Sequence, residues 1–161
     1  GLPMEKTVVK LLAEYGYNSE HSKAYVQSFD KDSLIEIRYA LQSDLKLVQL
    51  VGSSGAYDEM VTHDGLKAVS DYANAIGPSK ARVAESNGNI VQVARTHGLQ
   101  VHPYTFRADL VSETSVSFSD ELDLFINEFG VNGVFTDHPD QVLAHLGRAE
   151  LPNKLAGRCA E

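Results

Sequence analysis

Three side chains that can contact a ligand lie close together in the stretch Gly98–Asp109, which reads GLQVHPYTFRAD. They are His102, Tyr104 and Arg107. An arginine can pair with a phosphate group, while histidine and tyrosine can donate and accept hydrogen bonds. The first half of the stretch is apolar and predicts a strand. Pro103 belongs at a strand's margin because it has no amide to donate. The polar groups are therefore expected where this strand ends.

Polar residues follow the other predicted strands in the same way. Each strand begins apolar and ends in functional groups, as in VQSFD, LVQLV, IGPSK, VHPYTFR and VFTDHPD. In a (β/α) barrel the active site is built at this carboxyl-terminal face, from the ends of several strands. An open, doubly wound sheet also binds ligands at strand ends, but such folds often carry a glycine-rich phosphate turn. The chain has neither a G-x-G-x-x-G motif nor a P-loop, which favours the barrel.

Helical and strand patterns alternate along the chain. Strands are predicted at residues 24–28, 45–51, 74–80, from residue 98 onward, and at 131–136. Helices are predicted at residues 3–15, after an N-cap at Asp30, around 66–73, around 90–97, after an N-cap at Ser119, and up to about Leu146. No hairpin signal separates the strands, so the alternation predicts a parallel sheet covered by helices.

Several residues have a structural as well as a functional interpretation. Gln27 and Gln49 either hydrogen-bond neighbouring strands or contact a ligand, and the sequence favours neither. His102 is either a structural histidine or part of a site, and its neighbours Tyr104 and Arg107 favour the site. With Gln27, these three are the predicted substrate-binding residues.

Four charged residues are predicted to have no chemical role. Asp137 is interpreted as a helix cap, and Lys80 as a solvated loop charge. Glu121 and Asp123 have the spacing of paired carboxylate ligands, but on a helix such positions point apart. We therefore interpret them as a solvated helix face. The sequence predicts no catalytic residue and no metal ligand.

The composition excludes several classes of protein. The 161 residues are 43% hydrophobic with a formal net charge of −8, which opposes binding to nucleic acid. No apolar run approaches the roughly 20 residues of a membrane span. The single cysteine, Cys159, allows no internal disulfide. Residues 1–147 are predicted to form one domain and residues 148–161 a loose tail. The opening Gly-Leu-Pro-Met suggests a cut inside a larger protein.

Five motifs together resemble the carboxyl-terminal part of a glycerophosphodiester phosphodiesterase of the periplasmic bacterial type. They occur in the family's order, and they read AYVQSFDKDSL, LKLVQLV, YANAIGPSK, GLQVHPYTFRAD and GVNGVFTDHPD. The resemblance covers Ala24 to about Leu146 and implies an incomplete TIM-type barrel, with about the last five of eight parallel strands. It implies a hydrolase of glycerol and lipid metabolism that releases glycerol 3-phosphate and an alcohol, uses a divalent cation, typically calcium, and is periplasmic.

The chain departs from the family's pattern where the chemistry is expected. The resemblance implies a His-Arg-Gly after the first strand, a Glu-x-Asp metal pair after the second, a further histidine and a Glu-x-Lys. None occurs on a matching strand of this sequence. Two histidines would act as general acid and base while the cation stabilises phosphoryl charge. This chain is expected to supply pocket wall only. Tyr104 corresponds to an aromatic position near the family's substrate pocket.

Three hypotheses therefore stand. The chain is part of a phosphodiesterase barrel and is inactive alone, or it is a non-catalytic binding or interaction module derived from that barrel. The third is a TIM-type enzyme with an unrecognised site. Under the first hypothesis, the partner is the amino-terminal part of the barrel, or a second copy that pairs with the open strand edges.

Overall fold

The computed structural model describes residues 3–53, 55–112 and 115–148. Its strands are β1 (Tyr25–Ser28), β2 (Lys46–Val51), β3 (Ala75–Pro78) and β4 (Gln100–Val101). Its α-helices are α1 (Met4–Glu14), α2 (Lys31–Ile35), α3 (His63–Ser70), α4 (Lys80–Glu85), α5 (Asn89–Thr96), α6 (Phe118–Asp123) and α7 (Pro139–His145). Single π-helical turns, Glu36–Ala40 and Leu124–Glu128, extend α2 and α6, and short 3₁₀ turns, Gly55–Tyr57 and Glu59–Val61, precede α3.

The four strands form one parallel sheet in the order β1-β2-β3-β4. Neighbours in the sheet are neighbours in the chain, with Tyr25 opposite Lys46, Val48 opposite Ala75, and Ala75 opposite Gln100. Each crossover contains at least one helix, as parallel strands require. Sequential parallel strands with helical crossovers are the arrangement of a (β/α) barrel. The predicted α/β class and parallel sheet are confirmed.

The fourth and fifth strands are shorter than predicted. Beyond Val101 the chain keeps only one bridge to β3, between Ser79 and Tyr104, and residues 131–136 form a single parallel bridge, Phe106 with Thr136. Hydrogen bonds such as Phe135 N–H to Pro103 O and Phe106 N–H to Phe135 O still hold the two segments side by side. Pro103 has no amide to donate, and this interrupts a regular ladder.

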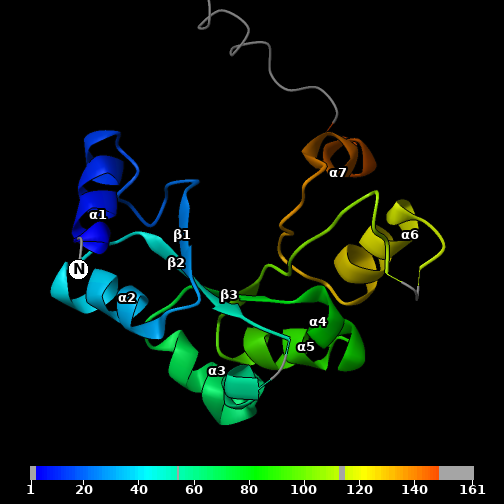
Figure 1. The fold of residues 1–161 in the computed structure, drawn as a ribbon, viewed down its shortest axis with the longest axis horizontal. Helices are drawn as coiled ribbons and strands as arrows, with labels where there is room; N and C mark the ends of the chain where they lie inside the picture. The colour runs from blue at the N-terminus through cyan, green and yellow to red at the C-terminus, as the bar shows by residue number, and fades with distance from the viewer. Residues whose placement is uncertain (1–2, 54, 113–114, 149–161) are drawn as a thin grey trace, which may run out of the picture.

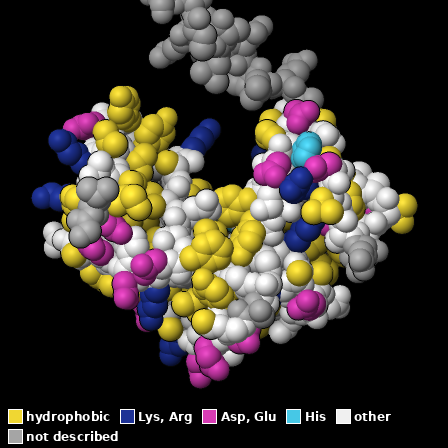
Figure 2. Space-filling model, viewed as in Figure 1, with side chains coloured by type: hydrophobic (Ala, Val, Ile, Leu, Met, Phe, Trp, Pro, Cys, Tyr) yellow, Lys and Arg dark blue, Asp and Glu magenta, His cyan; other side chains and the backbone are white. Residues whose placement is uncertain are grey.

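The helices lie on the outer side of a curved sheet (Figure 1). The main core fills the space between them and one face of the sheet, with Leu47, Ile76 and Val101 fully buried. Alternation along the strands turns Val48, Leu50 and Ala75 to the opposite, concave face. There they pack with the partly buried rings of Tyr25, Tyr104 and Phe135. Figure 2 shows a hollow in this view, floored by hydrophobic side chains.

Helix caps explain several boundaries. The predicted cap at Asp30 is confirmed, since its carboxylate accepts the Asp32 amide. The prediction for Ser119 is wrong: α6 begins two residues earlier, and the Ser117 hydroxyl accepts the Asp120 amide. Helix α4 was not predicted. Strand β3 ends at Pro78, Ser79 is the N-cap, and α4 begins at Lys80, so no loop separates the strand from the helix.

Candidate functional site

A cleft of about 330 Å³ opens at the carboxyl ends of the strands. Its lining comes from the ends of β1 and β2, the segment after β4, and the segment that precedes α7: Gln27, Phe29, Leu50, Tyr104, Thr105, Phe135, Thr136 and Asp137. This is the face where a (β/α) barrel places its active site. The structure thus brings two predicted residues, Gln27 and Tyr104, into one cleft.

Tyr104 is the most constrained of the predicted site residues. Its hydroxyl donates to the Val51 carbonyl at 2.9 Å, and its ring meets Phe29 edge-on with centroids 5.9 Å apart. Burial raises the pKa of Tyr104, with a further contribution from nearby Tyr57. The hydroxyl is therefore a neutral hydrogen-bonding group at physiological pH. The cleft gains a fixed aromatic wall.

His102 lies outside the residues that line the cleft, on the concave face of the sheet. Its ring packs edge-on against Tyr25 at 5.1 Å and Phe135 at 6.3 Å between centroids. A Cβ added at Gly133 would come within 3.2 Å of the ring, so glycine leaves room for the imidazole there. Burial lowers the pKa of His102 and favours the neutral ring.

Arg107 is engaged by carboxylates rather than pointing freely into the cleft. It donates to both carboxylate oxygens of Asp109, at 3.1 and 2.7 Å, and lies 3.7 Å from Asp137. The bond to Asp109 raises the pKa of Arg107 and lowers the pKa of Asp109. The prediction of Asp137 as a helix cap is wrong. Helix α7 has His138 at its N-cap position and no side chain caps it, while the Thr136 hydroxyl accepts the His138 amide.

The structure distinguishes the roles of Gln27 and Gln49, for which the sequence favoured neither a structural nor a ligand-binding interpretation. Gln49 is fully buried on the helix side of β2, where its amide donates to Phe29 O and Leu50 O and accepts from the Tyr72 hydroxyl. Gln49 is a structural residue. Gln27 is exposed at the cleft and keeps its place among the predicted ligand contacts.

The interpretation of Lys80 and Glu121 as separate solvated charges is wrong, because the two residues form an ion pair. Lys80 is not a solvated loop charge and Glu121 is not on a solvated face, because Glu121 is 0% exposed and both its oxygens accept from Lys80 Nζ, at 2.9 and 3.1 Å. Asp123 does face outward, beside His145 at 3.3 Å. The two residues of the pair are 41 positions apart, and no local pattern joins them.

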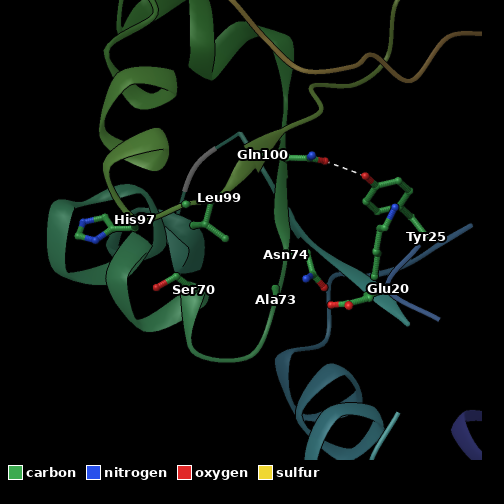
Figure 3. Close-up of a pocket in the computed structure, with 10 residues that line it drawn as sticks. Glu20, Tyr25, Ser70, Ala73, Asn74, His97, Leu99 and Gln100 are labelled. Carbon is green, nitrogen blue, oxygen red and sulfur yellow. Dashed lines mark hydrogen bonds between the residues drawn. The ribbon is translucent and has the colours of Figure 1, made fainter. Parts of the chain in front are cut away.

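A second pocket, of about 360 Å³, opens at the opposite end of the sheet (Figure 3). Its lining includes Glu20, Lys46 and Asn74, and the Tyr25 hydroxyl donates to the Gln100 side chain across it at 2.7 Å. None of the predicted site residues lines it. In (β/α) barrels this amino-terminal end serves stability rather than catalysis. The candidate site is therefore the cleft at the carboxyl ends.

Candidate metal ligands do not cluster in the part of the chain that the structure describes. Within residues 3–53, 55–112 and 115–148, no three His, Cys, Asp or Glu side chains stand close enough to hold a metal ion. These residues do not fit the divalent cation that the family generally uses. In the same ranges no helix is long and apolar enough to cross a bilayer.

The sheet order, the helical crossovers and the strand-end cleft define an α/β fold of the TIM-barrel type. Residues 2–141 match the glycerophosphoryl diester phosphodiesterase family, and the chain belongs to that family. The crystal structure of a proposed glycerophosphoryl diester phosphodiesterase from Silicibacter pomeroyi DSS-3 has a similar fold. It superposes with a TM-score of 0.65 at 21% identity, covering 92% of this chain and 46% of that one.

Sequence relatives agree with this assignment. A glycerophosphodiester phosphodiesterase of Bacillus subtilis is 31% identical over 141 residues, covering 85% of this chain and 42% of the relative. One from Haemophilus influenzae is 28% identical over 169 residues, covering 87% and 46%. The chain thus spans slightly less than half the length of the relatives it matches.

Proposed function

We propose that this chain supplies the carboxyl-terminal part of a glycerophosphodiester phosphodiesterase barrel. The reaction is hydrolysis: water adds to phosphorus, the bond to the alcohol oxygen breaks, and glycerol 3-phosphate and a free alcohol leave. This product connects the reaction to glycerol and lipid metabolism. The observation that carries the proposal is the cleft at the carboxyl ends of the strands, formed by residues inside the family match.

The character of the wall suggests which part of a substrate it touches. Phe29, Tyr104 and Phe135 line the cleft together with Asp137, and no Lys, Arg or His of the described residues lines it. Aromatic rings suit the carbon skeleton of the glycerol or alcohol group better than a phosphate. Arg107 reaches a phosphate only if the substrate displaces Asp109. We therefore expect Arg107 to contribute least of the predicted substrate residues.

The wall alone is not a complete catalytic site in this proposal. The general acid and base and the ligands of the cation, calcium by resemblance, would come from the amino-terminal part of the barrel. That part would also cover the concave face, where Val48 and Leu50 lie beneath the rings of Tyr25 and Phe135. A periplasmic location belongs to the same proposal and rests on the resemblance only.

The test compares this chain alone with a chimera that joins it to the amino-terminal half of the Haemophilus influenzae relative. With glycerophosphocholine and calcium, the chimera should release glycerol 3-phosphate and lose that activity with a chelator. The 161-residue chain alone should be inactive. Turnover by the chain alone would contradict the partial-site proposal. A folded but inactive chimera that still binds substrate would favour the alternative, a non-catalytic binding module.

Two variants of the chimera test the wall. Tyr104→Ala should raise KM more than it lowers kcat, because the ring contacts substrate without taking part in bond breaking. Tyr39→Ala is the matched control, since that exposed tyrosine lies away from the cleft lining and should leave both constants unchanged. Equal kinetics for the two variants would remove Tyr104 from the site.

A further inference from the structure

The most completely buried charge near the cleft belongs to Glu121, on α6. Both of its oxygens accept from Lys80 Nζ, and Oε1 also accepts the Ser112 amide at 3.0 Å. Taking a carboxylate out of water is unfavourable unless such partners replace the lost hydration. These hydrogen bonds come from two segments, the start of α4 and the loop that precedes α6. Glu121 therefore ties α6 to the start of α4 and to the loop around Ser112.

Lys80 adds three more contacts with residues 104–112. Its ammonium donates to Leu110 O at 3.3 Å and lies 5.6 Å from the centre of the Phe106 ring. Its backbone amide donates to Tyr104 O at 2.8 Å. Residues 104–112 are thus held at Tyr104, Leu110 and Ser112 by one lysine and its carboxylate partner.

The segment held in this way forms one wall of the cleft. Tyr104 and Thr105 line it, whereas Lys80 and Glu121 do not. We infer that Lys80 and Glu121 are positioning residues, a buried clamp that fixes residues 104–112 and with them the aromatic wall. The use of that wall rests on the proposed function, but the clamp can be tested without any reaction.

A double variant separates a positioning role for the pair from a role in the stability of the whole domain. Replacing a buried ion pair by apolar residues of similar size is often neutral or stabilising, whereas removing one partner is costly. The double variant Lys80→Met/Glu121→Leu should therefore keep the stability of the core. It also removes the acceptor for the Ser112 amide and the donor to Leu110 O. The wall should loosen while the domain stays folded.

The experiment records amide exchange and ¹H–¹⁵N spectra of the 161-residue chain. In the double variant we expect the Ser112 amide to exchange more than about tenfold faster and the Tyr104 and Thr105 resonances to shift or broaden, with an unchanged urea midpoint. The control carries the same substitutions at the exposed pair Lys10–Glu14 and should change none of these signals.

The single variant Glu121→Gln provides a second test in case the double variant does not fold. Glu121→Gln retains an oxygen that can accept from Ser112, so Ser112 should stay protected, while the Lys80 charge loses its counter-ion. Unchanged wall resonances in a folded double variant would overturn the inference. Loss of folding in both variants would also overturn it, because the pair would then serve the whole core rather than the wall.

Discussion

Replacing Gln49 by leucine tests how the sheet is joined to its helices. The side chain is fully buried, and its oxygen accepts from the Tyr72 hydroxyl at 2.8 Å while its amide donates to Phe29 O and Leu50 O. Burial raises the pKa of Tyr72 to about 12, so the hydroxyl carries its proton and needs an acceptor. Leucine fills a similar volume but offers neither donor nor acceptor.

The magnitude follows from the groups left without partners. A buried polar group that loses its partner costs about 1–3 kcal/mol. The Tyr72 hydroxyl is affected in full, and so is the carbonyl of Leu50, which is 9% exposed. The carbonyl of Phe29 is affected in part, because Phe29 is 46% exposed and water can reach it. Gln49→Leu should thus lower the free energy of unfolding by about 3 kcal/mol. That corresponds to a fall in Tm of about 6–12 °C for a domain of this size.

Urea denaturation followed by circular dichroism measures the effect, with a double-mutant cycle as the control. Tyr72→Phe alone should cost about 1 kcal/mol, since it leaves the Gln49 oxygen unpaired. The double variant should lose less than the sum of the two single losses, because neither member of the bond is then left alone. Additive losses, or a change below about 0.5 kcal/mol for Gln49→Leu, would refute the reasoning.

Two further predictions concern titration and backbone geometry. Burial lowers the pKa of His102, so the unfolded chain takes up this proton first as the pH falls below about 6.5. Urea midpoints should therefore fall between pH 7.5 and pH 5, and His102→Gln should flatten that slope; an unchanged slope would contradict the prediction. Gly88→Ala places a Cβ 2.6 Å from the Phe129 ring at φ +75°, while Gly98→Ala at φ +73° meets nothing within 4 Å. Both should lower the unfolding free energy by about 1 kcal/mol through the positive φ, and Gly88→Ala by more; equal urea midpoints would exclude the clash.

The parts of the fold that the sequence predicted depend on local pattern. Apolar runs such as LKLVQLV placed β2 to within one residue, and the aspartate before α2 marked its cap correctly. The predicted start of a helix was wrong where two residues near it could both serve as the N-cap. Ser117 and Ser119 both precede the same apolar stripe, and only the geometry of the loop selects Ser117 as the cap of α6.

The site was predicted only in part, because its residues are related across the sheet. A parallel sheet gathers strand ends, so Gln27 and Tyr104 could be placed together from their positions. Phe29, one residue beyond β1, and Phe135 were not singled out, since an isolated aromatic at a strand end looks like core. The clamp between Lys80 and Glu121 was missed because it joins two helices through side chains alone.

The charges near the cleft are paired, which agrees with the proposal that this chain supplies a binding wall. Arg107 is held by Asp109 at 2.7 Å, which raises the pKa of Arg107, and Lys80 is held by Glu121 at 2.9 Å. A general acid or base must instead exchange protons near the working pH. His102 has a lowered pKa, but its ring is packed between Tyr25 and Phe135. In the proposed function, the reactive groups for hydrolysis come from the amino-terminal part of the barrel, which would cover the concave side where His102 and these rings lie.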